Sequence, residues 1–221
     1  MKSYKYTINT EKININNPIY CYMLGLISTD GYIDNKNSRV CIRMRNEDTE
    51  RVFILLKEYL EFTGPIFTYK EVDKELRISP KELIQNLTEL GINKEKCNTP
   101  FLNLKGECMR LYLRGIHDGD GNVKRSFVKN KWRGGEYRLT NNNLIYLENL
   151  KKWMKENLNE VKTLNIREVK RKSGIFNELS TGVKEGKEYC EWLYKGYEEY
   201  RLNCKYNKYK SITNDEIVQP A

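Results

Sequence analysis

The sequence predicts an α+β protein made of two halves related by a pseudo-twofold axis, each with the element order αββαββα. One short segment occurs twice, as residues 23–31 (MLGLISTDG) and as residues 113–121 (LRGIHDGDG). In each copy apolar residues and a glycine lead to an acid followed by another glycine, a pattern typical of a helix that ends at the acid. The same succession of strand and helix patterns follows each copy, which is why we expect two related halves.

The two acids of the repeat, Asp30 and Asp120, stand at the unfavourable end of their predicted helices. The carbonyl end of a helix carries partial negative charge, so an aspartate there is disfavoured unless a positive charge lies beside it. A divalent cation supplies that charge and prefers oxygen ligands. The two acids are therefore candidate metal ligands.

In the first half, each predicted element has its own periodicity. Residues 40–45 alternate apolar and basic side chains, as a strand with one wet face does. Residues 49–60 carry apolar side chains at helical spacing, and residues 66–71 and 75–79 fit two short strands. Pro80 then begins the closing helix of this half.

The second half repeats this order with longer connections. Its predicted elements after the motif are strands at 126–129 and 136–140, a helix at 144–158, strands at 163–170 and 175–179, a helix at 185–194, and a basic segment through 210. The predicted organisation is an N-terminal extension (1–17), a first half (18–98), a connection (99–106), a second half (107–210) and a C-terminal tail (211–221).

The charge balance points to a polyanionic partner. Lys and Arg number 39 against 30 acids, giving a formal net charge of +9 and a pI near 9.1. Nucleic acid is the leading interpretation. We find no long apolar run, basic amphipathic helix or signal-peptide pattern, so we expect no membrane contact and a cytoplasmic or organellar-matrix protein that is not secreted.

The cysteines argue against zinc and against a disulfide framework. Six of them are scattered without a C-x-x-C pair, and the chain has one histidine. A dispersed set of this kind is typical of reduced, mostly buried thiols.

Taken together, these motifs resemble the LAGLIDADG homing endonucleases, in the form where both halves are fused in one chain. Residues 114–121 (RGIHDGDG) match the family motif strongly, whereas Ser28 replaces the motif's earlier acid in the first copy. Residues 90–100 and 192–206 resemble the segments that close the two halves in this family.

The resemblance implies a fold, a reaction and a partner. Motif helices pack at the interface of the halves, and antiparallel sheets form a saddle for double-stranded DNA. The implied protein is a monomer and a site-specific DNA endonuclease, needing no protein partner. It would hydrolyse phosphodiesters on both strands of a long asymmetric target with Mg²⁺ and leave short 3′ overhangs, with Mn²⁺ or Ca²⁺ substituting for binding.

Two glycines, Gly25 and Gly115, would let the motif helices cross in close backbone contact, because they lie about one and a half turns before the acids. The crossing brings Asp30 and Asp120 to one shared space. There the backbone carbonyls of Thr29 and Gly119, at the same helix ends, would join the two carboxylates as metal ligands.

Four further residues match positions that support catalysis in the family. Lys96 and Lys205 match lysines near the attacking water and the scissile phosphate, where they offset developing charge. Asn46 and Asn141 fall where the family places a polar residue that orients water.

Sequence recognition is expected from the strands. Arg39, Arg43 and Arg45 occupy odd positions of one predicted strand and so share a face. Arginine reads guanine and lysine grips phosphate, so affinity should depend on salt. The other candidate DNA-contacting residues are Tyr69, Lys70, Lys74, Arg77, Lys124, Lys129, Lys131, Trp132, Arg133, Arg138, Arg167, Lys170, Arg171 and Lys172.

Two other functions stay open at this point. A cleavage-inactive protein of the same fold would bind DNA or RNA only, as an intron maturase with an RNA partner or as a transcription regulator. A metal-independent structural protein would leave the placement of the two acids unexplained. Within the motifs, His117 is interpreted as a packing residue and Ser28 as a local helix-end polar group.

Overall fold

The computed structural model describes residues 6–45, 47–69, 71–92, 99–128, 131–159, 163–171 and 174–213. The side chains of residues 125–128, 131–134 and 212–213 are not described. Five predicted site residues therefore lie outside the described residues, namely Asn46, Lys70, Lys96, Lys129 and Lys172. The same holds for the side chains of Lys131, Trp132 and Arg133.

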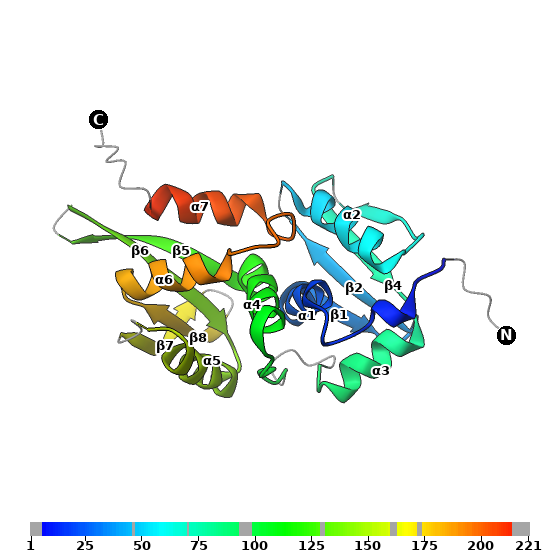
Figure 1. Ribbon diagram of the computed structural model, residues 1–221, viewed down its shortest axis with the longest axis horizontal. Helices are drawn as coiled ribbons and strands as arrows, with labels where there is room; N and C mark the ends of the chain where they lie inside the picture. The colour runs from blue at the N-terminus through cyan, green and yellow to red at the C-terminus, as the bar shows by residue number, and fades with distance from the viewer. Residues whose placement is uncertain are drawn as a thin grey trace.

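The predicted element order is confirmed in both halves (Figure 1). After the 3-10 turn η1 (Thr10–Lys12), the first half contains α1 (Pro18–Asp30), β1 (Gly31–Asp34), β2 (Arg39–Met44), α2 (Thr49–Leu60), β3 (Ile66–Tyr69), β4 (Asp73–Ile78) and α3 (Lys81–Glu89). The second contains α4 (Gly106–Asp120), β5 (Gly121–Val128), β6 (Lys131–Asn141), α5 (Leu144–Asn157), β7 (Leu164–Arg171), β8 (Gly174–Thr181) and α6 (Val183–Leu193), followed by α7 (Asn203–Thr213).

Each half builds one antiparallel sheet, and the two sheets have the same strand order. The first runs β1-β2-β4-β3 and the second β5-β6-β8-β7. Strand β5 begins at Gly121, directly after the motif acid. The prediction of a strand at 126–129 is therefore too late in the sequence. The start of β5 has a weak sequence signal, because Asn122 and Lys124 alternate with few apolar residues.

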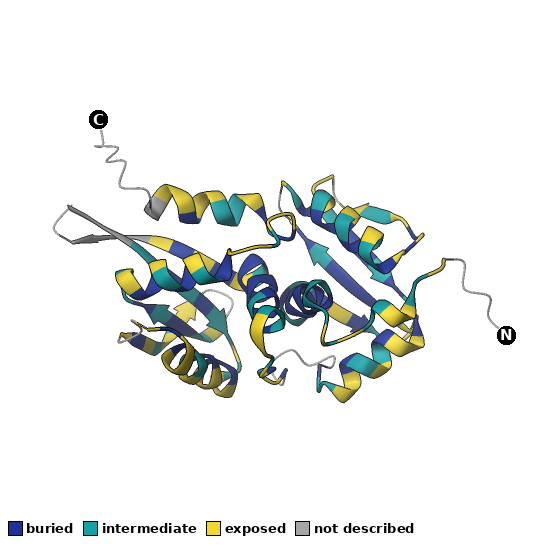
Figure 2. Ribbon diagram, in the orientation of Figure 1, coloured by how far each residue is buried: buried dark blue, intermediate teal, exposed yellow. Residues whose placement is uncertain are grey.

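The hydrophobic core explains why each strand has one inward face. Val40, Ile42 and Met44 of β2 are buried together with Val52 and Leu56 of α2, as the alternation predicted. Helix α1 is buried from Tyr20 to Ile27, and it lies beside α4 between the two sheets (Figure 2). Among the described residues no helix is long and apolar enough to cross a membrane.

Candidate site where the motif helices end

The two motif helices cross with their backbones in direct contact at Gly25 of α1 and Gly115 of α4. A Cβ atom placed on Gly25 would lie 2.8 Å from the Cα atom of Gly115, and one placed on Gly115 would lie 2.9 Å from the Cα atom of Gly25. Real Cβ atoms essentially never approach other atoms this closely, so only glycine fits at either position. The crossing predicted from the repeat is therefore present.

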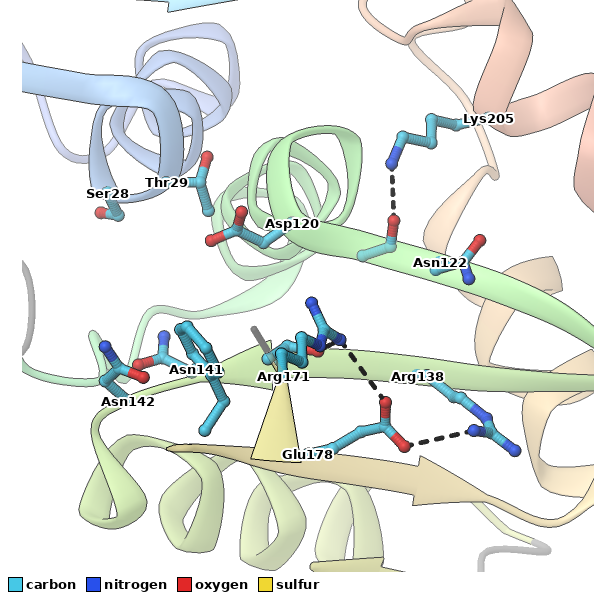
Figure 3. A pocket seen from close by; sticks show the side chains of 13 residues that line it. Ser28, Thr29, Asp120, Asn122, Arg138, Asn141, Asn142, Arg171, Glu178 and Lys205 are labelled. Atoms are coloured by element: carbon cyan, nitrogen blue, oxygen red, sulfur yellow. Dashed lines mark hydrogen bonds and ion pairs between the residues drawn. The ribbon is translucent and has the colours of Figure 1, made fainter. Parts of the chain in front are cut away.

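Beyond the crossing, the last turns of α1 and α4 bring their acids to one place. A Cβ atom on Gly119 would lie 2.6 Å from Oδ2 of Asp30, so the carboxylate of α1 rests against the last turn of α4. Asp30 is half-buried and Asp120 is exposed. Thr29 and Asp120 line an open cavity of about 460 Å³, shown in Figure 3.

The residues present fit a hard divalent cation. The carboxylates of Asp30 and Asp120 come from opposite helices, and the carbonyls of Thr29 and Gly119 lie one residue earlier at the same helix ends. Within the described ranges, no group of three or more His, Cys, Asp and Glu could hold a metal. A cation held by two carboxylates would keep coordination positions for water or for oxygen atoms of a substrate, as Mg²⁺ prefers.

Lys205 of α7 reaches the same cavity from the C-terminal part of the chain. Its Nζ donates a hydrogen bond of 2.6 Å to the carbonyl of Gly121, the residue that follows Asp120 (Figure 3). Asn141, at the end of β6, also lines the cavity, and its Oδ1 accepts a hydrogen bond of 2.8 Å from the backbone N–H of Asn143. Both residues therefore lie beside Asp120, the motif acid that lines this cavity.

No protein-family model matches the sequence, and no curated protein matches it. The structure of I-DmoI in complex with DNA and Ca matches with a TM-score of 0.56 and 18% identity, over 81% of this chain and 91% of that chain. The I-LtrWI LAGLIDADG homing endonuclease bound to target DNA matches with a TM-score of 0.54 and 17% identity, over 90% of each chain.

This chain has the LAGLIDADG homing endonuclease fold. The meganuclease I-AabMI, bound to uncleaved DNA, agrees with this result at a TM-score of 0.54 and 14% identity, covering 88% of this chain and 91% of that chain. All three matches extend over both halves, so they bear out the two-motif, single-chain form expected from the repeat.

Each sheet of this LAGLIDADG fold has one face packed on its helices and one face that points away from them, which we call the outer face. Most of the predicted recognition residues that the structure describes lie on the outer faces. Arg43 and Arg77 of the first sheet share a face. The Cζ atom of Arg43 lies 4.2 Å from the centre of the Tyr69 ring. Arg39 and Arg45 form ion pairs with Asp34 and Asp73, at 2.9 and 3.0 Å. In the second sheet, strand register places Lys124, Arg138, Arg167 and Arg171 on the corresponding face.

Two lysines do not share these faces. Lys74 is in register with Thr68, and its Nζ lies 2.8 Å from Glu50 at the start of α2. Lys170 alternates with Arg167 and Arg171 along β7 and therefore points to the opposite side of the sheet. Strand parity sends both side chains toward the helices, which corrects the prediction that they extend the outer faces.

Arg114, which interrupts the apolar stretch of the second LAGLIDADG motif, is a structural residue that the motif pattern did not single out. This arginine is fully buried. It donates hydrogen bonds to the carbonyls of Leu193, Lys195, Gly196, Tyr197 and Tyr200, between α6 and α7. An arginine at an otherwise apolar helix position was the available signal, because a buried guanidinium requires many acceptors.

The earlier acid of the second motif, Asp118, holds the segment that leads to Lys205. Its carboxylate is buried and accepts hydrogen bonds from Tyr22 of α1 at 2.7 Å and from the backbone N–H of Leu202 at 2.8 Å. Burial raises the pKa of Asp118 to about 7, although these hydrogen bonds lower it. In the first motif Ser28 donates to the carbonyl of Leu24, the local role predicted for it.

Helix α2 of the first half holds the same segment from the other side. Asp48 accepts a hydrogen bond from the backbone N–H of Asn203, the first residue of α7. Arg51 donates to the carbonyls of Glu199 and Arg201. The position of Lys205 therefore depends on residues from both halves.

His117 agrees with its interpretation as a packing residue. Its ring is completely buried and stacks on Tyr137, with ring centroids 5.2 Å apart. Burial, with smaller contributions from Lys205 and Lys208, lowers the pKa of His117 to about 3. The imidazole is therefore neutral at neutral pH.

We expect His117 to make the fold sensitive to acid. Below its unfolded pKa of 6.5 the unfolded chain binds a proton here that the folded chain does not take up until about pH 3. Stability is therefore lost as the pH falls through this window. Between pH 7 and 4.5, the free energy of unfolding of His117→Leu, measured with urea, should fall by about 2.5 kcal/mol less than that of the wild type. Asp118, whose pKa is raised, acts in the opposite direction in both proteins and so cancels from this difference. Equal losses of unfolding free energy in the two proteins would contradict the lowered pKa of His117.

Proposed function

We propose that this protein is a site-specific DNA endonuclease that hydrolyses both strands of a long asymmetric duplex with Mg²⁺ and leaves short 3′ overhangs. The observation that carries the proposal is the approach of the Asp30 carboxylate to Gly119, the residue before Asp120, at the ends of two crossing helices. Outer sheet faces rich in arginine flank this point in both halves. Solved structures of the same fold include the homing endonuclease I-DmoI, in complex with DNA and Ca or with DNA and Mn.

In this proposal the carboxylates of Asp30 and Asp120, with the carbonyls of Thr29 and Gly119, hold the cation. Bound Mg²⁺ would activate water at neutral pH and stabilise the leaving oxygen of the phosphodiester. Because the two acids come from different halves, and each half would contact a different part of the duplex, the metal site would lie between the two DNA strands to be cut. This position suits cuts on both strands close to the pseudo-twofold axis.

Lys205 and Asn141 supply the remaining chemistry of the second half. The ammonium group of Lys205 lies at the carbonyl of Gly121, where it would offset negative charge on a phosphate placed beside Asp120. Asn141 lines the same cavity and would orient a water molecule through its side-chain amide. By the sequence resemblance, we assign the equivalent roles in the first half to Lys96 and Asn46.

A pooled cleavage assay tests the proposal. The purified full chain is incubated with a randomised duplex library, with Mg²⁺ or with EDTA, and the DNA ends are sequenced. We expect metal-dependent ends, enriched at one asymmetric sequence, with 3′ overhangs. Duplexes that are bound and not cut would favour a cleavage-inactive DNA-binding protein. A parallel titration in which the chain binds RNA and not DNA would favour a maturase.

Lys205→Met is expected to slow cleavage by roughly 10²- to 10³-fold, because it removes the positive charge beside the reacting phosphate. DNA affinity should stay within a few-fold, since one cation among many contributes little to the total. Single-turnover cleavage and a binding titration in Ca²⁺ separate the two effects. The matched control is Lys187→Met on the exposed surface of α6, which should cleave normally. Normal cleavage by Lys205→Met would contradict its role.

A further inference from the structure

Each sheet carries a buried glutamate on its outer face, enclosed by arginines. In the first sheet Glu75 of β4 contacts Arg43 and Arg77, which we name the first cluster. In the second sheet Glu178 of β8 contacts the guanidinium groups of the second cluster, Arg138, Arg167 and Arg171. Strands β4 and β8 occupy the same place in the two strand orders, so the feature occurs once in each half.

In the first cluster, the carboxylate of Glu75 is completely buried between two guanidinium groups. The Nε atom of Arg43 donates to Oε2 at 2.5 Å, and Arg77 donates from Nε to Oε1. The guanidinium of Arg43 lies 4.2 Å above the ring of Tyr69, and that of Arg77 lies 4.1 Å above the ring of Phe67. Each arginine is thus held by the same carboxylate on one side and by an aromatic ring on the other.

Glu75 remains ionised in this position. Burial raises the pKa of the carboxyl group, and the hydrogen bonds from Arg77 and Arg43 more than offset it, so the pKa lies below its usual value. A buried ion pair adds little net stability compared with apolar packing, because both charges must leave water. Stability is therefore a weak reason for a carboxylate at the centre of an arginine-rich surface.

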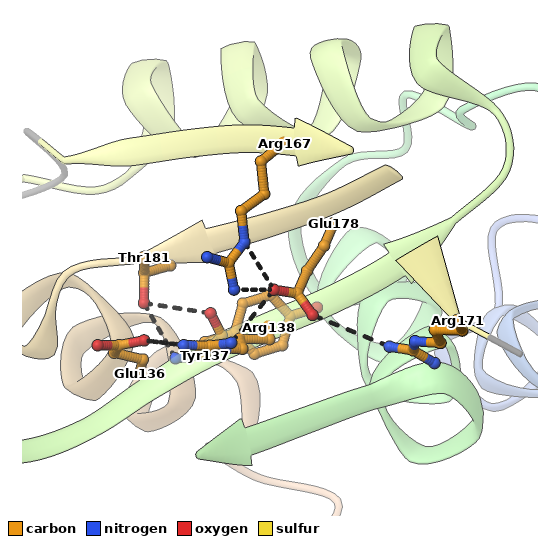
Figure 4. Close-up of polar contacts among 7 residues, drawn as sticks. All are labelled: Glu136, Tyr137, Arg138, Arg167, Arg171, Glu178 and Thr181. Atoms are coloured by element: carbon orange, nitrogen blue, oxygen red, sulfur yellow. Dashed lines mark hydrogen bonds and ion pairs between the residues drawn. The ribbon is translucent and has the colours of Figure 1, made fainter. Parts of the chain in front are cut away.

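The second cluster repeats the arrangement with a different set of contacts (Figure 4). Oε1 of Glu178 accepts hydrogen bonds from Arg167 at 2.9 Å and from Arg138 at 3.2 Å. Arg138 also donates to Oε2 of Glu136 at 2.6 Å, so two carboxylates hold this guanidinium group. Arg171 lies 3.9 Å from Oε2 and donates to the hydroxyl group of Thr140 at 2.9 Å. The two clusters therefore share a central glutamate while presenting their arginines differently.

An arginine fixed in this way is better suited to reading bases than to gripping phosphate. A guanidinium has five N–H donors, so one that gives two of them to a carboxylate still has others to donate. Two parallel donors match the O6 and N7 acceptors of guanine in the major groove. Holding the side chain in advance lowers the entropy cost of binding, and the carboxylate weakens the non-specific attraction to phosphate.

We propose that Glu75 and Glu178 are positioning residues for sequence recognition, each orienting the arginines of its cluster to read guanines in one half of the DNA target. This inference depends on DNA binding by the proposed function and does not require cleavage. Because the clusters differ, the guanines read by one half are expected at positions different from those read by the other.

Binding selection from a randomised duplex pool tests the inference. The wild type, Glu75→Gln and Glu178→Gln are compared as full chains in Ca²⁺, so that binding is scored without cutting. Arg43→Lys and Arg167→Lys identify which positions of the target each cluster reads. Glu71→Gln, at the exposed turn that precedes β4, is the matched control for loss of one negative charge near this face.

In the wild type we expect a guanine preference of about ten-fold or more at the positions that these lysine variants alter. Glu75→Gln should reduce that preference to about two-fold at the first-cluster positions only, and Glu178→Gln at the second-cluster positions only. Affinity for random DNA should stay equal or rise in both, which a merely unfolded variant would not show. Glu71→Gln should keep the full preference.

Two outcomes would overturn the inference: guanine preferences that survive both glutamine variants, or a wild type that selects no guanines at all. A separate result bears on the nuclease itself. If the wild type selects a site with these preferences and does not cut it in Mg²⁺, the proposed cleavage fails while the role of the glutamates is upheld.

Discussion

Asp30→Asn and Asp120→Asn are each expected to reduce double-strand cleavage by more than about 100-fold. Loss of a residue that only supports a metal ligand typically costs 10- to 100-fold, so loss of a ligand itself should cost more. The amide keeps the shape of the side chain and removes its negative charge at the point where α1 and α4 end. DNA affinity in EDTA should stay within about three-fold, because each change also removes a repulsive charge near phosphate.

The measurement is a single-turnover cleavage assay on the selected target, paired with a binding titration. Glu82→Gln, an exposed acid in the first turn of α3, is the charge-matched control and should cleave like the wild type. Full cleavage by both aspartate variants would rule out the metal assignment. Loss of binding together with cleavage would show instead that the acids maintain the fold.

Gly25→Ala is expected to destabilise the protein by at least about 2 kcal/mol, with the same result for Gly115→Ala. In an unobstructed helix this substitution would stabilise, because alanine is the better helix former. Here the new methyl group would lie 2.8 Å from the backbone N of Ile116, and backbone atoms cannot move aside without separating the helices. Urea unfolding measures the loss, and cleavage should fall with it because the acids move apart.

Gly106→Ala separates helix crowding from backbone strain. Gly106 has φ of +53° and no atom within 4 Å of an added Cβ, so the substitution should cost about 1 kcal/mol through its left-handed backbone alone. If Gly25→Ala cost no more than this control, the helices would be able to separate without penalty. The close crossing would then not be what brings the acids together.

Much of the fold could be predicted from neighbours along the chain. Residues 49–60 were predicted as a helix, and α2 has these bounds, because apolar spacing and breakers are local signals. The acids were placed at helix ends for the same reason, since Gly31 and Gly121 follow them directly. Strand β5 could not be delimited in this way. Its first residues are polar and form a strand because they pair with β6, not because their own sequence alternates.

The sequence by itself thus determined the duplicated halves, the order of their elements and the two acids that end the motif helices. Only the tertiary structure decided that Arg114 and Asp118 hold the chain that carries Lys205, and that Glu75 and Glu178 each gather arginines on an outer face. The physical reason is that periodicity and capping act between residues a few positions apart. Which buried charges meet depends on strand register and on the packing of one half against the other.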